Sequence, residues 1–402
     1  MTGDRPPETG RWRGLIVLLT LAHVIGTVGY VMVMATAPLI RADLDLNATQ
    51  IGSFMSAFYL ALGVTALPAG LWVDRIGVGK ALAVSMVLLA AGAAGFASVQ
   101  SYLPAVLASF FMGVGYGLVN PATAKGVLDG FAAAERATAM GVKQTGVPVG
   151  GLIAAGLAAW AGVLTWRGIL LGVAGVTVLL GIAWWWRSRR DCAAPSWGKG
   201  LPLAGIRTVF GNRGIIALNG AGFAFNGAQQ SLATYLTLFL RDAAMASQPF
   251  ASFCLGAAQV AGACGRILWS LASDRLARGR RKIVLVVMMS MAALAFAAAA
   301  AIGQGWPQAA LVFVAVAAGA TVLAYAPLMH TACAEAVEAG NAGAAIGTNL
   351  LATALGGTVC PLAFGALVDG LGGYGAAWFG IALITAVGVL AIVIGLEEGR
   401  RR

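Results

Sequence analysis

The residues that could do chemistry in this chain are cationic side chains inside long apolar segments. Arg266 and Lys143 each lie within such a segment, and His330 lies in another. An ionisable side chain inside a membrane is costly, so it usually faces a cavity or a partner and is a candidate for function. The planar guanidinium of Arg266 can hold a carboxylate through two parallel hydrogen bonds. The chemistry indicated is the binding of an anion.

The acidic residues are placed differently from these cations. None of the 15 Asp and Glu residues falls in the middle of an apolar segment. A cavity with cations and no carboxylates attracts anions and repels cations, because charge is weakly screened at low dielectric. We therefore expect a small anionic substrate, with a carboxylate as the favoured group.

Neutral polar residues recur at helical spacing along several apolar segments and could hydrogen-bond the rest of a substrate. Residues three or four apart share one face of a helix, as Asn226 and Gln229 do. Interhelical hydrogen bonding is the alternative for each such group. No catalytic set, metal site or cofactor is predicted. The predicted binding residues are Arg266, Lys143, His330, Asn120, Tyr30, Asn226, Gln229 and Asn349.

The charged candidates also have plainer explanations. Arg266 could be satisfied by helix carbonyls or by a loop acid, and Lys143, about two turns inside its segment, could extend to the lipid headgroups. Lys125 lies nearer the end of its segment and is expected at the membrane interface. His330 could carry a coupling proton or could be a satisfied packing residue.

The composition predicts a protein that lies in a membrane. Of the residues, 59% are hydrophobic and 10% are charged. Lipid offers no partners for backbone amides, so apolar segments of this length must be helices. The predicted fold is an all-α membrane protein with twelve transmembrane helices, at 14–38, 49–72, 80–99, 104–127, 137–161, 168–186, 214–240, 249–272, 283–303, 308–333, 342–367 and 375–396.

A polar stretch with several prolines and glycines divides these helices six and six. We predict a six-helix bundle over 1–186, a linker over 187–213 and a second bundle over 214–402. Basic residues of the connecting segments fall almost entirely on one side, and only Arg41, Arg167 and Arg241 fall on the other. The positive-inside rule then predicts a bacterial inner-membrane protein with a cytoplasmic linker and cytoplasmic termini. The net charge of +11 therefore indicates topology and not nucleic-acid binding.

One connecting segment recurs in the second half of the chain. Residues 70–80 read GLWVDRIGVGK, and residues 271–275 read LASDR, so that Asp74 and Arg75 recur as Asp274 and Arg275. This pattern resembles the signature loop of the major facilitator superfamily, and the resemblance covers essentially the whole chain. It implies two pseudo-symmetric bundles and a gating latch formed by Asp74, Arg75, Asp274 and Arg275. Ordinary positive-inside charge would explain the arginines but not the two acids. Ser270 and Ala277 replace both glycines in the second copy.

The same resemblance bears on two further segments. The spacing of Arg266, Ser270 and Asp274 is similar to that of monocarboxylate, oxalate-type and nitrate carriers of the superfamily, which implies that Arg266 binds the substrate. The glycines and proline of segment 146–151 resemble a motif of the family's antiporters. They are also what any two closely packed membrane helices require.

The leading hypothesis is an uptake carrier for a small organic anion that works by rocker-switch alternating access, with proton symport as an extension. It is not expected to be an enzyme, and a monomer surrounded by membrane lipids is expected from the resemblance. An exporter of drugs or of neutral or anionic metabolites is the alternative. A sensor that binds without transport is a third hypothesis. No phosphate-binding loop for ATP occurs.

Overall fold

The computed structural model describes residues 9–132, 135–189, 211–338 and 341–397, and its regular elements within these ranges are all helices. In chain order they are α1 (Thr9–Ala35), α2 (Ala37–Leu44), α3 (Ala48–Ile76), α4 (Val78–Ser98), α5 (Tyr102–Gly130), α6 (Arg136–Gln144), α7 (Gly146–Ala159), α8 (Ala161–Leu164), α9 (Trp166–Ser188), α11 (Arg213–Asp242), α12 (Gln248–Leu271), the π-helical turn η1 (Ala272–Leu276), α13 (Arg281–Ala300), α14 (Gln308–Val322), α15 (Ala326–Glu335), α16 (Ala342–Leu371) and α17 (Tyr374–Gly395).

Each of the twelve predicted spans corresponds to one long helix or to a pair of shorter ones. Within the described residues, nine helices are long and apolar enough to cross a membrane, and a tenth is added when α3 is counted as a bent span. α11 is less apolar because it carries Asn219, Asn226, Gln229 and Gln230. Polar residues of this kind are expected on a helix that faces protein rather than lipid.

Two predicted helices are broken away from their ends. The span predicted at 137–161 is broken between α6 and α7, and the span predicted at 308–333 is broken between α14 and α15. Proline lacks the N–H that a helix needs, and Pro148 and Pro327 lie just after the two breaks. The short helix α2 was not predicted. Most of the predicted linker 187–213 lies outside the described residues, so that boundary stays a prediction.

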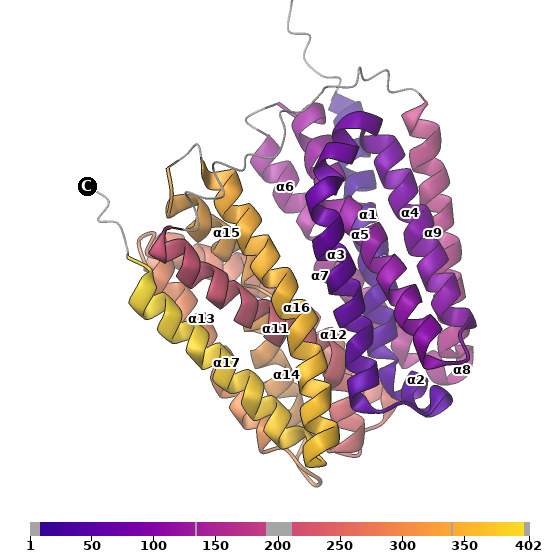
Figure 1. The fold of residues 1–402 in the computed structure, drawn as a ribbon, viewed down its shortest axis with the longest axis vertical. Helices are drawn as coiled ribbons and strands as arrows, with labels where there is room; N and C mark the ends of the chain where they lie inside the picture. Colours follow the sequence, from indigo (N-terminus) through magenta and orange to yellow (C-terminus); the bar gives the residue numbers. More distant parts are fainter. Residues whose placement is uncertain (1–8, 133–134, 190–210, 339–340, 398–402) are drawn as a thin grey trace, which may run out of the picture.

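The helices form two groups. In the N-terminal half, α3 and α4 pack against α5, and α9 packs against α4; in the C-terminal half, α11 packs against α16 and α17, and α13 against α17. Figure 1 shows the two halves as a purple group and an orange to yellow group that approach each other at one end and diverge at the other. We call the end where α9 ends and α11 begins the linker end, and the opposite one the closed end. The main contacts between halves are α3 with α16 and α7 with α12.

Glycines allow α3 and α16 to cross closely near the closed end. A Cβ atom on Gly52 would lie 2.4 Å from the Pro361 carbonyl oxygen, and one on Gly365 would lie 2.6 Å from the Ala48 carbonyl oxygen. A side chain at either position would push the helices apart. The antiparallel α3–α16 pair is therefore the tightest point of contact described between the halves.

Hydrogen bonds between the halves gather at the same end. The Asp369 carboxylate, at the end of α16, accepts from the backbone N–H groups of Ala48 (2.9 Å) and Thr49 (2.8 Å) and from the Thr49 hydroxyl (2.5 Å). These donors are the first residues of α3, where N–H groups have no intrahelical partner and an anion is favoured. Further links at this end are Arg41 with Asp242, Tyr235 with Ala48, Thr237 with Met34 and Gln248 with Ala35.

The contact of Asp369 with the start of α3 predicts the effect of Asp369→Asn. The amide keeps the size of the carboxylate but loses its charge, so the halves should separate more often at the closed end. The contact between the halves should lose about 1 kcal/mol of stabilisation, which corresponds to about a fivefold shift in population toward the separated closed end. Spin labels at the exposed positions Leu103 and Met245, in a background without other cysteines, measure this as a longer distance. Asp45→Asn, at an exposed acid of the same end, is the control. Identical distance distributions for the two variants would show that the Asp369 contact does not hold the closed end together.

Candidate substrate-binding site

Arg266, on α12, lies between the two halves. Its Nε donates to the carbonyl of Leu323 in the C-terminal half (3.0 Å), and its Nη1 donates to the carbonyl of Gln144 in the N-terminal half (3.4 Å). The side chain is half-buried. Arg266 therefore bridges the halves at a place that remains partly accessible.

Both carbonyls that accept from Arg266 lack their usual donor within the helix because of a proline. In an α-helix each carbonyl accepts from the N–H four residues later. Four residues after Gln144 stands Pro148, and four residues after Leu323 stands Pro327, and neither has an N–H to donate. The two helix breaks thus provide the acceptors that Arg266 needs.

These two carbonyls do not use the full binding capacity of Arg266. A guanidinium has five N–H donors, of which two make the contacts above, and no carboxylate of the described residues lies within 4.0 Å of it. No described acid therefore neutralises its charge. Ionisable side chains that interact electrostatically with Arg266 include His23, Tyr30, Tyr116, Tyr325 and His330. A planar cation with spare donors among such groups can bind an anion.

Lys143 is the second cation of this region. Its Nζ donates to the Thr123 hydroxyl (3.0 Å) and to Asn120 Oδ1 (3.4 Å), and the residue is only 1% exposed. It therefore does not extend to the lipid headgroups, which was one of the two alternatives. Within the described part of the chain it has no carboxylate partner. Asn120 is exposed and links this buried cation to an accessible surface.

Thr123 organises the cluster around Lys143. Its hydroxyl donates to the Val119 carbonyl (2.7 Å) and lies 2.9 Å from His23 Nε2. Because the single hydroxyl proton is used on Val119, the hydroxyl accepts from both Lys143 and His23. We therefore assign the proton of a neutral His23 to Nε2, which leaves the buried Nδ1 without a partner in the structure.

The other predicted binding residues differ in what surrounds them. Tyr30 packs in an aromatic group with Phe58 and Tyr116, and the Tyr116 hydroxyl lies 3.2 Å from Thr27 Oγ1. His330 and Gln229 are half-buried and form no hydrogen bond with another described residue.

Asn226 and Asn349 instead hold two helices together. The Asn226 amide donates to the Thr353 carbonyl (2.7 Å), and the Asn349 amide donates to the Leu218 carbonyl (2.9 Å). Both are buried between α11 and α16. Interhelical hydrogen bonding, the alternative to substrate binding, fits these two residues.

The glycines of segment 146–151 serve close packing. A Cβ on Gly146 would lie 2.7 Å from the Thr20 carbonyl oxygen of α1, and one on Gly151 would lie 2.5 Å from the Gln259 side chain of α12. Close approach of α7 to α1 and α12 accounts for these glycines. This was the structural alternative to an antiporter motif.

The predicted latch residues pair within their own halves. Asp74 contacts Lys125 (3.1 Å), which also contacts Asp129 (3.6 Å). Asp274 contacts Arg281 (2.5 Å), and Arg281 also reaches Glu335 (3.3 Å). Lys125, expected only at the interface, is thus an ion-pair partner. Arg75 and Arg275 are exposed. A latch between the halves at this end stays a prediction.

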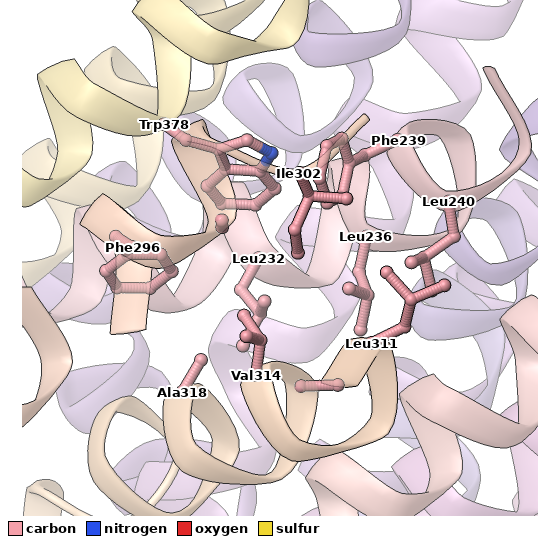
Figure 2. Close-up of a pocket in the computed structure, with 12 residues that line it drawn as sticks. Leu232, Leu236, Phe239, Leu240, Phe296, Ile302, Leu311, Val314, Ala318 and Trp378 are labelled. Atoms are coloured by element: carbon pink, nitrogen blue, oxygen red, sulfur yellow. The ribbon is translucent and has the colours of Figure 1, made fainter. Parts of the chain in front are cut away.

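A small cavity in the C-terminal half is not suited to an anion. It measures about 10 Å³ and is lined by apolar residues of α11, α13, α14 and α17. Figure 2 shows that the indole nitrogen of Trp378 is the one polar atom drawn among the lining side chains. The cavity has room for little more than a water molecule.

A helical membrane protein with two halves and a charged site between them has the architecture of a secondary transporter. The Major Facilitator Superfamily model matches residues 19–306 and 236–402. The chain belongs to this superfamily, and the relatives that it resembles are named as transporters and not as enzymes.

Two relatives illustrate the sequence similarity. The chain is 31% identical over 171 residues to the probable L-galactonate transporter of Escherichia coli K12, which is 42% of this chain and 38% of the relative. It is 30% identical over 139 residues to the hexuronate transporter of Bacillus subtilis, which is 35% of this chain and 33% of the relative. The matches therefore span about a third to two-fifths of these relatives.

Solved structures share the fold over nearly the whole chain. A bacterial homologue of the human lysosomal transporter Spinster, inward-facing and unoccupied, aligns with a TM-score of 0.77 at 18% identity, covering 98% of this chain and 96% of that one. A POT family transporter in complex with 5-aminolevulinic acid aligns with a TM-score of 0.80 at 14% identity, covering 96% of both chains. At these identities the likeness concerns the fold alone.

Sequence reasoning missed the groups that hold the two cations. Thr123 was not selected, although it follows Asn120 at helical spacing, and the carbonyls of Gln144 and Leu323 carry no side-chain signal. The prolines four residues later, at 148 and 327, were the available clue. The tertiary structure was needed to bring both breaks to one arginine.

The Thr123 cluster predicts a difference between two threonine variants. Thr123→Val leaves the buried donors of Lys143 and His23 without their shared acceptor, so unfolding should become easier by about 1–3 kcal/mol. The melting temperature of the purified protein in detergent measures the loss. Lys143→Met in the Thr123→Val protein removes one stranded donor and should restore part of the stability.

The matched control is Thr177→Val, because the buried Thr177 hydroxyl donates only to the Val173 carbonyl of its own helix among described residues. Equal melting temperatures for Thr123→Val and Thr177→Val would show that the Thr123 hydroxyl does not hold the cluster.

Proposed function

We propose that this protein transports a small organic anion across the membrane and recognises the anion through a carboxylate. The observation that supports this most directly is Arg266, a partly accessible guanidinium between the halves with spare donors and no carboxylate among the described residues within 4.0 Å. Lys143 adds a second positive charge without a carboxylate partner in the described chain. An anion entering this region would supply the missing negative charge.

The names of the relatives support a hydroxylated or otherwise polar acid. They include transporters of L-galactonate, hexuronate, galacturonate and sulfoacetate, and each name denotes an organic acid anion. For this chain we infer that Arg266 receives the carboxylate, and that Tyr116, Asn120 and Gln229 hydrogen-bond the polar remainder. No specific observation favours the exporter alternative.

The proposed orientation puts the linker end in the cytoplasm of a bacterial inner membrane. At the closed end, two of the three predicted outer arginines, Arg41 and Arg167, pair with Asp242 and Asp43. Basic residues of the linker end are more numerous, as the positive-inside rule requires. With closed-end contacts made, this conformation would face inward. Rocker-switch exchange would break those contacts and bring the linker ends together around the Arg266 site.

A binding measurement tests the anion proposal. A ligand that binds the folded state raises its melting temperature by mass action. We expect stabilisation of the purified protein by D-galacturonate, L-galactonate or sulfoacetate, and none by uncharged galactose. Arg266→Ala should weaken binding by about 10–100-fold, as expected for a lost charged hydrogen bond. Arg266→Lys should recover it only partly, because lysine lacks the planar fork.

Pro327→Ala is an informative companion variant in the same experiment. It gives the Leu323 carbonyl an intrahelical donor that competes with Arg266, so binding should weaken by less than in Arg266→Ala. Pro68→Ala, at an exposed helix proline elsewhere, is the control. Stabilisation by galactose or by cationic drugs alone, or full retention of binding by Arg266→Ala, would overturn the anion site.

We extend the proposal to proton symport, with His330 as the proton carrier. His330 is half-buried on α15 and makes no hydrogen bond with another described residue. Uptake of the bound acid into proteoliposomes should be accelerated by an acidic exterior, and His330→Gln should remove this acceleration. Uptake that does not depend on the pH gradient would rule out proton symport and would not affect the proposed anion site.

A further inference from the structure

A groove of about 500 Å³ opens at the linker end of the C-terminal half, between the end of α12 and the start of α13. Its apolar walls include Trp269, Leu276, Ile283 and Val287, and Arg278 and Arg280 also line it. Leu276 is 84% exposed, Ile283 43% and Val287 42%. α13 packs against α14, α15 and α17 of its own half. The residues that line the groove do not include Arg266.

The local fold of the second signature loop places the two arginines at this groove. The π-helical turn η1 is closed by hydrogen bonds from Ala277 N to the Ala272 carbonyl (2.8 Å) and from Gly279 N to the Ser273 carbonyl (2.7 Å). Arg278 (φ 52°) and Gly279 (φ 80°) then reverse the chain in the left-handed region. In the first copy Gly77 (φ 82°) makes this turn. In the second copy the turn therefore comes one to two residues later than in the first copy, and the two arginines of the turn, Arg278 and Arg280, line the groove.

No acid of the described residues pairs with the side chains of Arg278 and Arg280. Neither side chain forms an ion pair or a hydrogen bond with another described residue, whereas the side chain of the neighbouring Arg281 is paired with Asp274 and Glu335. Both side chains are exposed. The groove thus combines two positive charges with exposed apolar walls.

We propose that this groove binds an anionic phospholipid, with its phosphate between Arg278 and Arg280 and an acyl chain against Leu276, Ile283 and Val287. Charge complementarity selects an anion, and the exposed apolar walls at the end of the membrane-spanning helices select one that carries hydrocarbon. A water-soluble anion would leave those walls uncovered. The proposal depends on the fold and is independent of the transported substrate.

Native mass spectrometry of the purified protein in detergent tests this proposal. Phosphatidylglycerol and phosphatidylcholine with identical acyl chains are added at equal concentrations. The wild type should retain phosphatidylglycerol preferentially, and the Arg278→Gln/Arg280→Gln variant should lose most of that preference, about fivefold or more given two lost charge contacts. Arg275→Gln is the matched control, because Arg275 is exposed in the same turn but does not line the groove. A symmetric elution profile confirms that each variant is folded.

Two further measurements distinguish a bound lipid from other ligands. Val287→Trp fills the apolar wall and leaves the charges intact, so it should reduce retention of phosphatidylglycerol. Glycerol 1-phosphate, which has the headgroup charge without acyl chains, should not displace the lipid. Equal retention of both lipids by the wild type, equal behaviour of the double variant and Arg275→Gln, or displacement by glycerol 1-phosphate would overturn the proposal.

Discussion

A guanidinium inside a membrane-embedded bundle must find its hydrogen-bond acceptors within the protein, and the centre of this structure depends on how Arg266 finds them. Pro148 and Pro327 cannot donate to the carbonyls of Gln144 and Leu323, so these carbonyls turn to the arginine. The breaks between α6 and α7 and between α14 and α15 follow from the same missing donors. One residue type thus bends two helices and creates the polar groups that hold the charge between the halves.

This arrangement ties the binding region to the contact between the halves. Arg266 belongs to the C-terminal half but donates to Gln144 of the N-terminal half. The contact is longer than the one to Leu323, and a carboxylate that binds the spare N–H donors would lie beside it. A ligand at this position would therefore act on the relation of the two halves, as alternating access requires.

The antiparallel pair α3 and α16 carries the complementary contact at the closed end. Asp369 near the end of α16 meets the unpaired N–H groups at the start of α3, while Asp74 near the end of α3 pairs with Lys125 in its own half. One acid at each end of the pair gives the molecule two places where a charge can meet a helix terminus. In this conformation only the closed-end acid makes such a contact across the halves, among the residues described.

The sequence by itself determined the membrane character, the twelve spans and the superfamily, because long apolar segments in lipid must be helices and because the signature loop recurs as Asp74-Arg75 and Asp274-Arg275. It also selected Arg266 and Lys143, since a cation in an apolar segment stands out without any knowledge of its neighbours. The tertiary structure alone decided what surrounds them. Asn226 and Asn349 have the same polar character as Asn120, yet they are buried between α11 and α16 while Asn120 is exposed beside Lys143. Helical spacing defines a face of a helix, and only packing decides whether that face meets another helix, lipid or an accessible site.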